Sequence, residues 1–260
     1  MPSAFAASRS TSRRAFLANM AAAPLLLRRR TDSGPDEFTE PVDPRRSAII
    51  LCDVWDKHWC RGANERLDPI VARAEPFLVK ARVKGVTIIH APSDTMDFYK
   101  DAPGRRAVLD LPAAKPPAPK DITAPPLPID DSDGGCDTPG DQQHKAWTRQ
   151  HPGITIFPGD FITDKGDEVY RVLTARRIDK LFIMGVHTNM CILNRTFAIR
   201  QMTKWGVHCV LLRDLTDAMY DPKDRPYVSH QRGTELVIEH IERYWCPSTT
   251  SAALLKALGS

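Results

Sequence analysis

One cysteine of the sequence has the type and position needed for nucleophilic chemistry. Cys191 ends the segment GVHTNMC (residues 185–191), which follows an apolar run and precedes a helical pattern over about residues 190–205. A thiol at the start of a helix lies near the positive end of the helix dipole, which lowers its pKa. The first N–H groups of that turn lack helical partners and can stabilise an oxyanion. The segment therefore predicts a cysteine nucleophile beside an oxyanion site.

Polar side chains also stand at the ends of three other apolar runs. Asp53 lies near the end of the first run, His90 ends the second and Asp160 follows the third. If these runs are strands of one parallel sheet, their carboxyl ends meet at the edge where ligands bind. A carboxylate there can take the proton of the thiol, which makes Asp53 the candidate base. The expected substrate pocket has five candidate residues: Trp55, His58, His90, Asp160 and Asn189.

Each candidate also has an ordinary structural explanation. Cys191 could be an unreactive core thiol, and Asp53 could simply cap a loop. His58 and His90 could be ordinary residues at strand ends, and Trp55 could only pack. The position of Cys191 in a turn before a helix favours the reactive interpretation.

The elements that must position these residues follow from the pattern of apolar side chains. Near-continuous apolar runs are typical of strands buried on both faces of a parallel sheet, and 3–4 spacing is typical of helices that cover such a sheet. We expect strands at residues 48–54, 86–90, 154–157, 181–185 and 207–212, and helices at 67–84, 167–177, 190–205 and 229–244. This alternation predicts an α/β fold with right-handed crossovers and helices on both sides of the sheet.

The charge of the chain is unevenly distributed. The 260 residues carry a formal charge of +4, with 26% charged and 42% hydrophobic residues. Residues 1–30 contain six arginines and no acid, so residues 31–260 carry 30 − 32 = −2. The basic excess therefore belongs to the N-terminus and does not indicate a nucleic-acid-binding domain. The composition also excludes a wholly disordered chain and a membrane protein with several spans.

The N-terminus resembles a bacterial twin-arginine export signal. Arg13 and Arg14 precede an apolar stretch that extends to Leu27 and is too short to span a bilayer. A run of three alanines, residues 21–23, is a possible cleavage site. We therefore expect a leader at residues 1–30, a linker at 31–46, one domain at 47–258, and export to the periplasm or the extracellular space.

A long segment interrupts the alternation of strands and helices. Residues 111–143 contain eight prolines and an acidic run, DDSDGGCD, at 130–137. The run lacks EF-hand spacing, which leaves a solvated loop, an ordered flap over the active site or a Ca²⁺ site as alternatives. The six cysteines are widely spaced, contain no CxxC pair and do not suggest a disulfide-dense scaffold.

Three segments resemble the isochorismatase-like cysteine hydrolases. GVHTNMC is similar to the nucleophile turn of that superfamily, and LCDVW (51–55) is similar to the strand that carries its catalytic aspartate. The segment VLLRD (210–214), followed by TDA (216–218), is similar to the next strand and loop. The resemblance covers about residues 47–258, apart from the insertion.

The resemblance implies a three-layer α/β/α fold with a mostly parallel sheet. It also implies hydrolysis of amide or ureido C–N bonds, or of vinyl ethers as in isochorismatase proper. Cys191 would be the nucleophile and Asp53 the base. The peptide bond between Val186 and His187 would be the cis bond of the family, with the His187 and Cys191 N–H groups binding the oxyanion.

One member of the Asp–Lys–Cys triad of the family is missing. The lysine is expected just after the third strand, where this chain has Pro158, Gly159 and Asp160. His58, His187 or Lys165 could supply the positive charge instead, and Lys57 and Lys145 could do so only from other loops. The alternative to an enzyme is a non-catalytic protein of the same fold that binds small molecules.

We expect a small-molecule substrate, no cofactor and no nucleic-acid partner. Nicotinamidase relatives bind a metal through an Asp-x-His pair and a second histidine. Asp56 and His58 have this spacing but follow the first strand instead of the second, so no metal is expected. After cleavage of the leader we expect no membrane contact. Relatives of this fold commonly form homo-oligomers, and we expect the same here.

Overall fold

The structure of the protein, a computed structural model, describes residues 23–259. An eight-stranded sheet has the order β2-β1-β8-β7-β6-β3-β4-β5. Strands β3 to β8 run parallel, whereas β1 pairs antiparallel with both β2 and β8. The strands are β1 Leu25–Thr31, β2 Gly34–Glu40, β3 Ser47–Cys52, β4 Thr87–Ala91, β5 Phe161–Ile162, β6 Lys180–Val186, β7 His208–Asp217 and β8 Ser248–Thr249.

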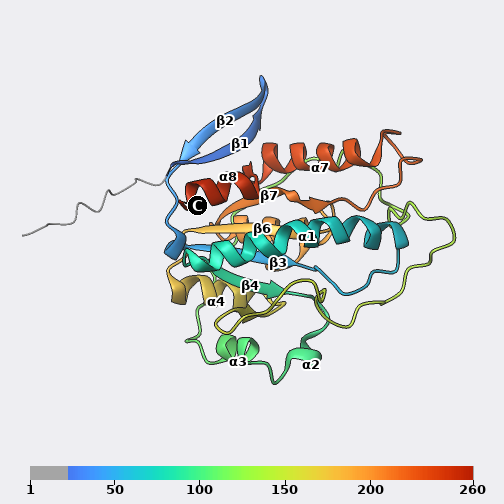
Figure 1. The fold of residues 1–260 in the computed structure, drawn as a ribbon. Helices are drawn as coiled ribbons and strands as arrows, with labels where there is room; N and C mark the ends of the chain where they lie inside the picture. Colours follow the sequence, from blue (N-terminus) through green and yellow to red (C-terminus); the bar gives the residue numbers. More distant parts are fainter. Residues whose placement is uncertain (1–22, 260) are drawn as a thin grey trace, which may run out of the picture.

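Helices cover both faces of this sheet (Figure 1). They are α1 Arg61–Val83, α2 Met96–Tyr99, α3 Pro103–Leu109, α4 Gly166–Arg176, α5 Cys191–Asn194, α6 Ile199–Lys204, α7 His230–Tyr244 and α8 Ser251–Ala257. A short 3-10 turn, Pro44–Arg46, precedes β3. None of the helices in residues 23–259 is long and apolar enough to cross a bilayer.

The central strand β3 shows why the layers form. All six of its residues are buried, and successive side chains point to opposite faces of the sheet. Ile49 and Leu51 join an apolar cluster with α1 and α8, whereas Ala48 and Ile50 join a cluster with α4, α6 and α7. The expected α/β/α fold with a mostly parallel sheet is confirmed.

The N-terminal boundary expected from the sequence is wrong. Residues 25–30, assigned to the leader, lie in β1, and residues 31–46, assigned to a linker, end β1 and include β2 and the 3-10 turn. Leu25 and Leu27 are fully buried, while Leu26 between them is 41% exposed. The sequence does not show this alternation of buried and exposed residues, which is typical of a strand, because all three residues are leucines in one apolar run. The twin arginines lie outside the described residues.

The third parallel strand is displaced from its expected position. Residues 154–157 form no strand; the N–H groups of Thr155 and Phe157 donate to the side chains of Glu75 and Asp160. The strand that pairs with β4 on the side opposite β3 is β5, and it contains two residues only. Side-chain acceptors thus bind two N–H groups of this segment in place of a neighbouring strand.

The helix expected over residues 190–205 is interrupted. It begins as α5 at Cys191 but ends after Asn194, because the backbone becomes extended at Arg195. The chain resumes helical structure only at Ile199. The interruption turns the Arg195 side chain toward the end of β3, where it pairs with Asp53.

The insertion at residues 111–143 is an irregular, ordered strap. Its N–H groups at Lys120 and Asp130 donate to the carbonyls of Lys204 and Arg225, which lie on separate elements. The strap then returns to the start of α1, to which it is joined by a disulfide. In Figure 1 the green segment passes along the side of the molecule where α1 begins. Of the alternatives left by the sequence, the structure therefore favours an ordered segment.

Candidate active site

Cys191 and Asp53 lie side by side at the carboxyl edge of the sheet. Strands β3 and β6 are neighbours, and Cys52 pairs with Gly185 in their register, so the loops that follow them meet. After burial, the negative charge of the nearby Asp53 is the main effect that raises the pKa of the Cys191 thiol, so the two side chains are near neighbours. Cys191 keeps some accessible surface, whereas Asp53 is fully buried. The two groups expected to form the nucleophile and its base are therefore neighbours at this edge.

Asp53 is held by backbone and side-chain donors. Its Oδ1 accepts the Ser93 N–H at 2.8 Å, and its Oδ2 accepts Nε of Arg195 at 2.8 Å. The Asp53 N–H in turn donates to the carbonyl of Ala91 at the end of β4. These contacts fix the position of the Asp53 carboxylate at the end of β3.

Burial and charge together determine which of the two groups holds the proton. Burial raises the pKa of Asp53, although the Arg195 guanidinium and the hydrogen bonds of the carboxylate oppose this effect. Burial and then the negative charge of Asp53 raise the pKa of Cys191. The pKa of Cys191 is thus raised, not lowered as expected from its place at a helix start, and the four residues of α5 offer only a short helix dipole. In the resting site the thiol is therefore protonated.

The turn before Cys191 carries the two N–H groups that the resemblance assigns to the oxyanion. The peptide bond between Val186 and His187 is cis, as the resemblance implied. The His187 backbone N–H opposes the rise in the pKa of Cys191, so it lies near the sulfur. The Cys191 N–H begins α5 and therefore has no acceptor within that helix.

Neither of the two histidines of the site, His58 and His187, supplies a positive charge. Burial lowers the pKa of His187 to about 3 and that of His58 to about 4, and the rings lie 4.9 Å apart in an edge-to-face arrangement. Both side chains are thus neutral near pH 7. This corrects the hypothesis that one of them replaces the missing lysine.

None of the candidate lysines pairs with Asp53 in residues 23–259. Lys145 donates to the backbone carbonyl of Asp94, and Lys165 lies at the N-terminus of α4. The carboxylate pairs instead with Arg195, which the sequence analysis did not consider. The available signal was the spacing: Arg195 stands four residues after Cys191, about one helical turn away.

An aromatic wall stands beside the Cys191–Asp53 pair. Trp55 stacks on Trp147 with their ring centroids 4.0 Å apart, and His58 is nearly parallel to Trp147 at 6.1 Å. The Trp55 indole N–H donates to the carbonyl of Ser93, which places the wall next to Asp53. Trp147, just beyond the strap, was missed because nothing in its local sequence marks it.

His90 and Asp160 do not belong to this group. The two side chains hydrogen-bond each other at 3.0 Å, and Asp160 also forms a bidentate pair with Arg82. The other ring nitrogen of His90 contacts Gln150. This buried network joins α1, β4 and the loop before β5, so their role is structural.

Asn189 joins separate segments near the nucleophile turn. Its side-chain N–H donates to Asp131 of the strap and to the carbonyl of Met219, and its side-chain oxygen accepts the Met219 N–H. The residue therefore fixes the turn between β6 and α5 against the strap and the loop after β7. Its contacts are with protein, not with the aromatic wall.

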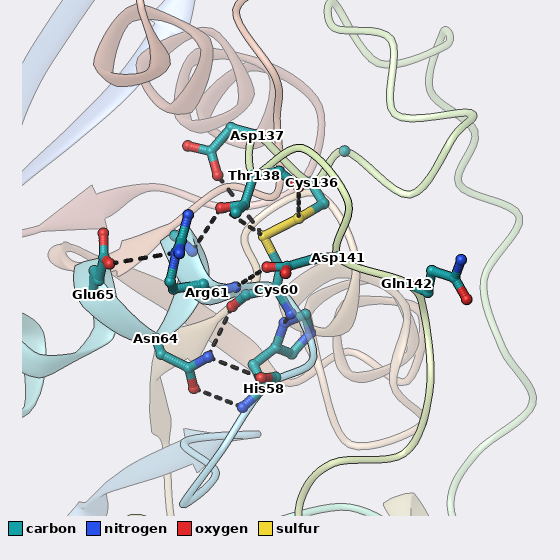
Figure 2. Close-up of a disulfide and its surroundings, with 12 residues drawn as sticks. His58, Cys60, Arg61, Asn64, Glu65, Cys136, Asp137, Thr138, Asp141 and Gln142 are labelled. Carbon is teal, nitrogen blue, oxygen red and sulfur yellow. Dashed lines mark hydrogen bonds and ion pairs between the residues drawn. A yellow bond between two sulfur atoms is a disulfide. The ribbon is translucent and has the colours of Figure 1, made fainter.

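A disulfide fastens the strap to the loop before α1 (Figure 2). Cys60 is bonded to Cys136, and Thr138 accepts the N–H of Gly62 at 3.0 Å in the first turn of α1. Asp141 accepts the N–H of Arg61 at 2.7 Å. The strap therefore supplies both the N-terminal cap of α1 and a covalent link to the segment that carries His58.

Asp137 and Asp56 are the acidic side chains to consider for metal binding. Within residues 23–259, the one group of His, Cys, Asp and Glu side chains close enough to hold a metal is Cys60, Cys136 and Asp137, whose sulfurs form the disulfide. Asp56 instead accepts hydrogen bonds from Thr148 and Arg149. The Asp56-x-His58 pair therefore lacks the arrangement of a ligand set.

Residues 47–226 match the isochorismatase domain. The chain belongs to the isochorismatase family. The matched segment contains Asp53, Cys191 and the cis peptide bond, as well as the strap. No match is found among curated proteins.

Solved structures of bacterial proteins share the fold. A cysteine hydrolase from Pseudomonas syringae pv. phaseolicola 1448A is 18% identical, with a TM-score of 0.54; the match covers 84% of this chain and 94% of the other. An isochorismatase-like protein from Burkholderia xenovorans LB400 is 15% identical, with a TM-score of 0.51 and coverage of 84% and 88%. At these identities the likeness establishes the fold and not the substrate.

Proposed function

We propose that this isochorismatase-family protein is a cysteine hydrolase that cleaves the C–N bond of a small amide, ureido compound or related substrate. The observation that carries the proposal is the placement of Cys191 and the buried Asp53 carboxylate together, after the carboxyl ends of the neighbouring strands β6 and β3. The family membership supports the same reaction class.

The first half of the reaction forms an acyl-enzyme. As the sulfur of Cys191 attacks the carbonyl carbon, the thiol proton passes to Asp53 and the C=O electrons move to the oxygen. That oxygen accepts hydrogen bonds from the His187 and Cys191 N–H groups. When the intermediate collapses, the C–N bond breaks, the amine takes the proton from Asp53, and a thioester remains on Cys191.

Water completes the turnover. Asp53 accepts a proton from a water molecule whose oxygen attacks the thioester carbon, and the C–S bond then breaks. The proton returns from Asp53 to the sulfur, so the thiol is regenerated and the carboxylic acid product leaves. Each step uses the same carboxylate, which its hydrogen bonds keep in one position.

We further propose that the protein works outside the cytoplasm on a small molecule, as a homo-oligomer, without a cofactor or a nucleic-acid partner. The twin arginines at residues 13 and 14 support export. The Cys60–Cys136 disulfide supports it independently, because structural disulfides are typical of oxidising compartments.

Turnover of a panel of small amides and ureido compounds tests the proposed reaction. We expect release of amine or ammonia by the wild-type protein and its loss in Cys191→Ala. Cys209→Ala is the matched control, since Cys209 is a buried free thiol outside the site and this variant should keep the activity. Unchanged turnover by Cys191→Ala would contradict the proposal. A wild-type protein that binds members of the panel without turning them over would support the non-catalytic alternative.

A further inference from the structure

Asp53 has one cationic partner in the described part of the chain. Arg195 Nε lies 2.8 Å from Oδ2 of Asp53, and the carboxylate itself is fully buried. A buried carboxylate without a counter-charge takes up a proton, since burial disfavours its ionised form. Protonated Asp53 could not accept the thiol proton, so the reaction proposed above depends on this ion pair.

We propose that Arg195 is the third member of the catalytic group and takes the place of the lysine of the family triad. The proposal rests on the proposed function, because it assigns a role in the same reaction. The positive charge of Arg195 keeps Asp53 ionised before the attack. After the proton has moved from Cys191 to Asp53, the same charge faces the thiolate, so the net charge of the three groups stays constant.

The surrounding residues hold the guanidinium in this position. Its carbon lies 5.8 Å from the centre of the Trp55 ring, and Nη2 lies 3.5 Å from Oδ2 of Asp94. The backbone leaves the helix at Arg195, and from this position the side chain pairs with Asp53. The cation therefore comes from the segment that carries the nucleophile, not from the third strand.

The segment where the family lysine is expected, residues 158–160, makes other contacts in this chain. Asp160, in that segment, binds Arg82 and His90 in a buried network. That network contains its own cation and carboxylate, and it makes no ion pair with Asp53 among the described residues. The chain thus departs from the family pattern in two related ways. The lysine after the third strand is absent, and Arg195, at the end of α5, pairs with Asp53.

An arginine in this role has a chemical consequence that a lysine lacks. Its guanidinium stays charged throughout the accessible pH range, and the pKa of Arg195 is raised further by Asp53. Because the positive charge does not titrate, the alkaline side of the activity profile should contain no contribution from it. The acid side should depend on the Asp53–Cys191 pair, which titrates as a unit.

The rate at which iodoacetamide alkylates Cys191, measured against pH, tests Arg195 without any substrate. The modified peptide is quantified by mass spectrometry, so the other free cysteines do not interfere. In Arg195→Gln we expect the acid limb of the rate to move to higher pH by about 1 to 3 pH units, because the cation no longer favours the ionised pair. Arg195→Lys should keep the limb near its wild-type position, since the charge is retained.

Arg200→Gln is the matched control. Arg200 lies on α6 and binds Asn194 at 2.7 Å, but it does not contact Asp53. Its replacement should leave the alkylation profile unchanged, and thermal unfolding of each variant shows whether the fold is retained. If Arg195→Gln fails to fold, Arg195→Lys carries the test: the proposal requires it to react with the wild-type pH profile, and a displaced acid limb would contradict it.

The outcomes separate this proposal from the proposed function. A folded Arg195→Gln protein whose alkylation profile matches the wild type would overturn the role of Arg195, whatever the substrate. Absence of turnover in the wild type, together with a displaced profile in Arg195→Gln, would overturn the proposed reaction and leave the charge relationship intact. Where turnover is measurable, kcat/KM of Arg195→Gln at pH 7 should fall by about 100-fold or more.

Discussion

Asp53 and Arg195 form an ion pair that joins the end of β3 to the residue at which α5 ends. The carboxylate is fully buried, whereas the arginine side chain is 31% exposed. The pair thus has one desolvated partner and one that reaches the surface. Breaking such a pair is costly because it leaves the buried charge alone, and this dependence links the local fold to the proposed chemistry.

Replacement of the base should abolish catalysis while retaining the binding site. In Asp53→Asn the side chain keeps its shape but cannot accept the thiol proton, so we expect kcat to fall by about 10²- to 10⁴-fold. The KM of the best substrate in the amide panel should change little, because the aromatic wall is intact. A kcat within a few-fold of wild type would contradict the role of Asp53.

The pH profile of kcat/KM should have its acid limb set by the Asp53–Cys191 pair. Burial raises the pKa of Asp53, so activity should be lost on the acid side at a pH above the ordinary aspartate value of about 3.9. Activity is retained above this limb, because Asp53 must be ionised to accept the proton. His58→Gln should leave the limb in place, since burial keeps that ring neutral; movement of the limb in this variant would assign it to the histidine.

The aromatic wall should govern substrate binding more than chemistry. Trp147→Ala removes the ring that stacks on Trp55, and we expect a higher KM with a smaller change in kcat. Trp205→Ala is a control for the loss of a large aromatic residue, because Trp205 packs against Tyr170 at a distance from the site. An equal rise in KM in both variants would indicate a general loss of structure.

Reduction of the Cys60–Cys136 disulfide should destabilise the protein. The bond closes a loop with a sequence separation of 76, for which chain entropy gives a contribution of about 4 kcal/mol. Urea unfolding with and without a phosphine reductant measures the difference. The double variant Cys60→Ser, Cys136→Ser should resemble the reduced protein and should not respond to the reductant. Equal stability of the oxidised and reduced proteins would show that the bond does not constrain the unfolded chain.

The folded domain should include β1. Leu25→Ala should lower the free energy of unfolding by about 2–5 kcal/mol, because Leu25 is fully buried in the cluster with α1 and α8. Leu26→Ala, one residue later and partly exposed, should change it by less than about 0.5 kcal/mol. Similar effects of the two substitutions in urea unfolding would contradict the register of β1.

The strongest sequence signals were those that depend on local pattern. The apolar runs of β3, β4 and β6 indicated buried parallel strands, and the turn before Cys191 indicated the family and the cis bond. Both features are encoded in contiguous residues. The order of the strands then brings Asp53 and Cys191 together, although 138 positions separate them in the sequence (191 − 53).

The features that the sequence did not reveal depend on distant contacts. Arg195 was hidden within an apparently continuous helix, whereas in the structure the helix ends after Asn194 and Arg195 pairs with Asp53. β1 was hidden in the apolar run of the N-terminus, since burial of Leu25 requires α1 and α8. Trp147 lies on Trp55 where the next residues, Thr148 and Arg149, hydrogen-bond Asp56, a contact between segments far apart in the sequence.

Mass spectrometry of the protein during turnover tests the central claim most directly. Rapid acid quenching with the best substrate in the amide panel, followed by peptide mapping, should reveal an acyl group on Cys191. The mass increase should equal the acyl part of the substrate, and it should be absent in Cys191→Ala. Turnover of that substrate with no adduct at Cys191 under single-turnover conditions, or by Cys191→Ala at the wild-type rate, would contradict nucleophilic catalysis by Cys191.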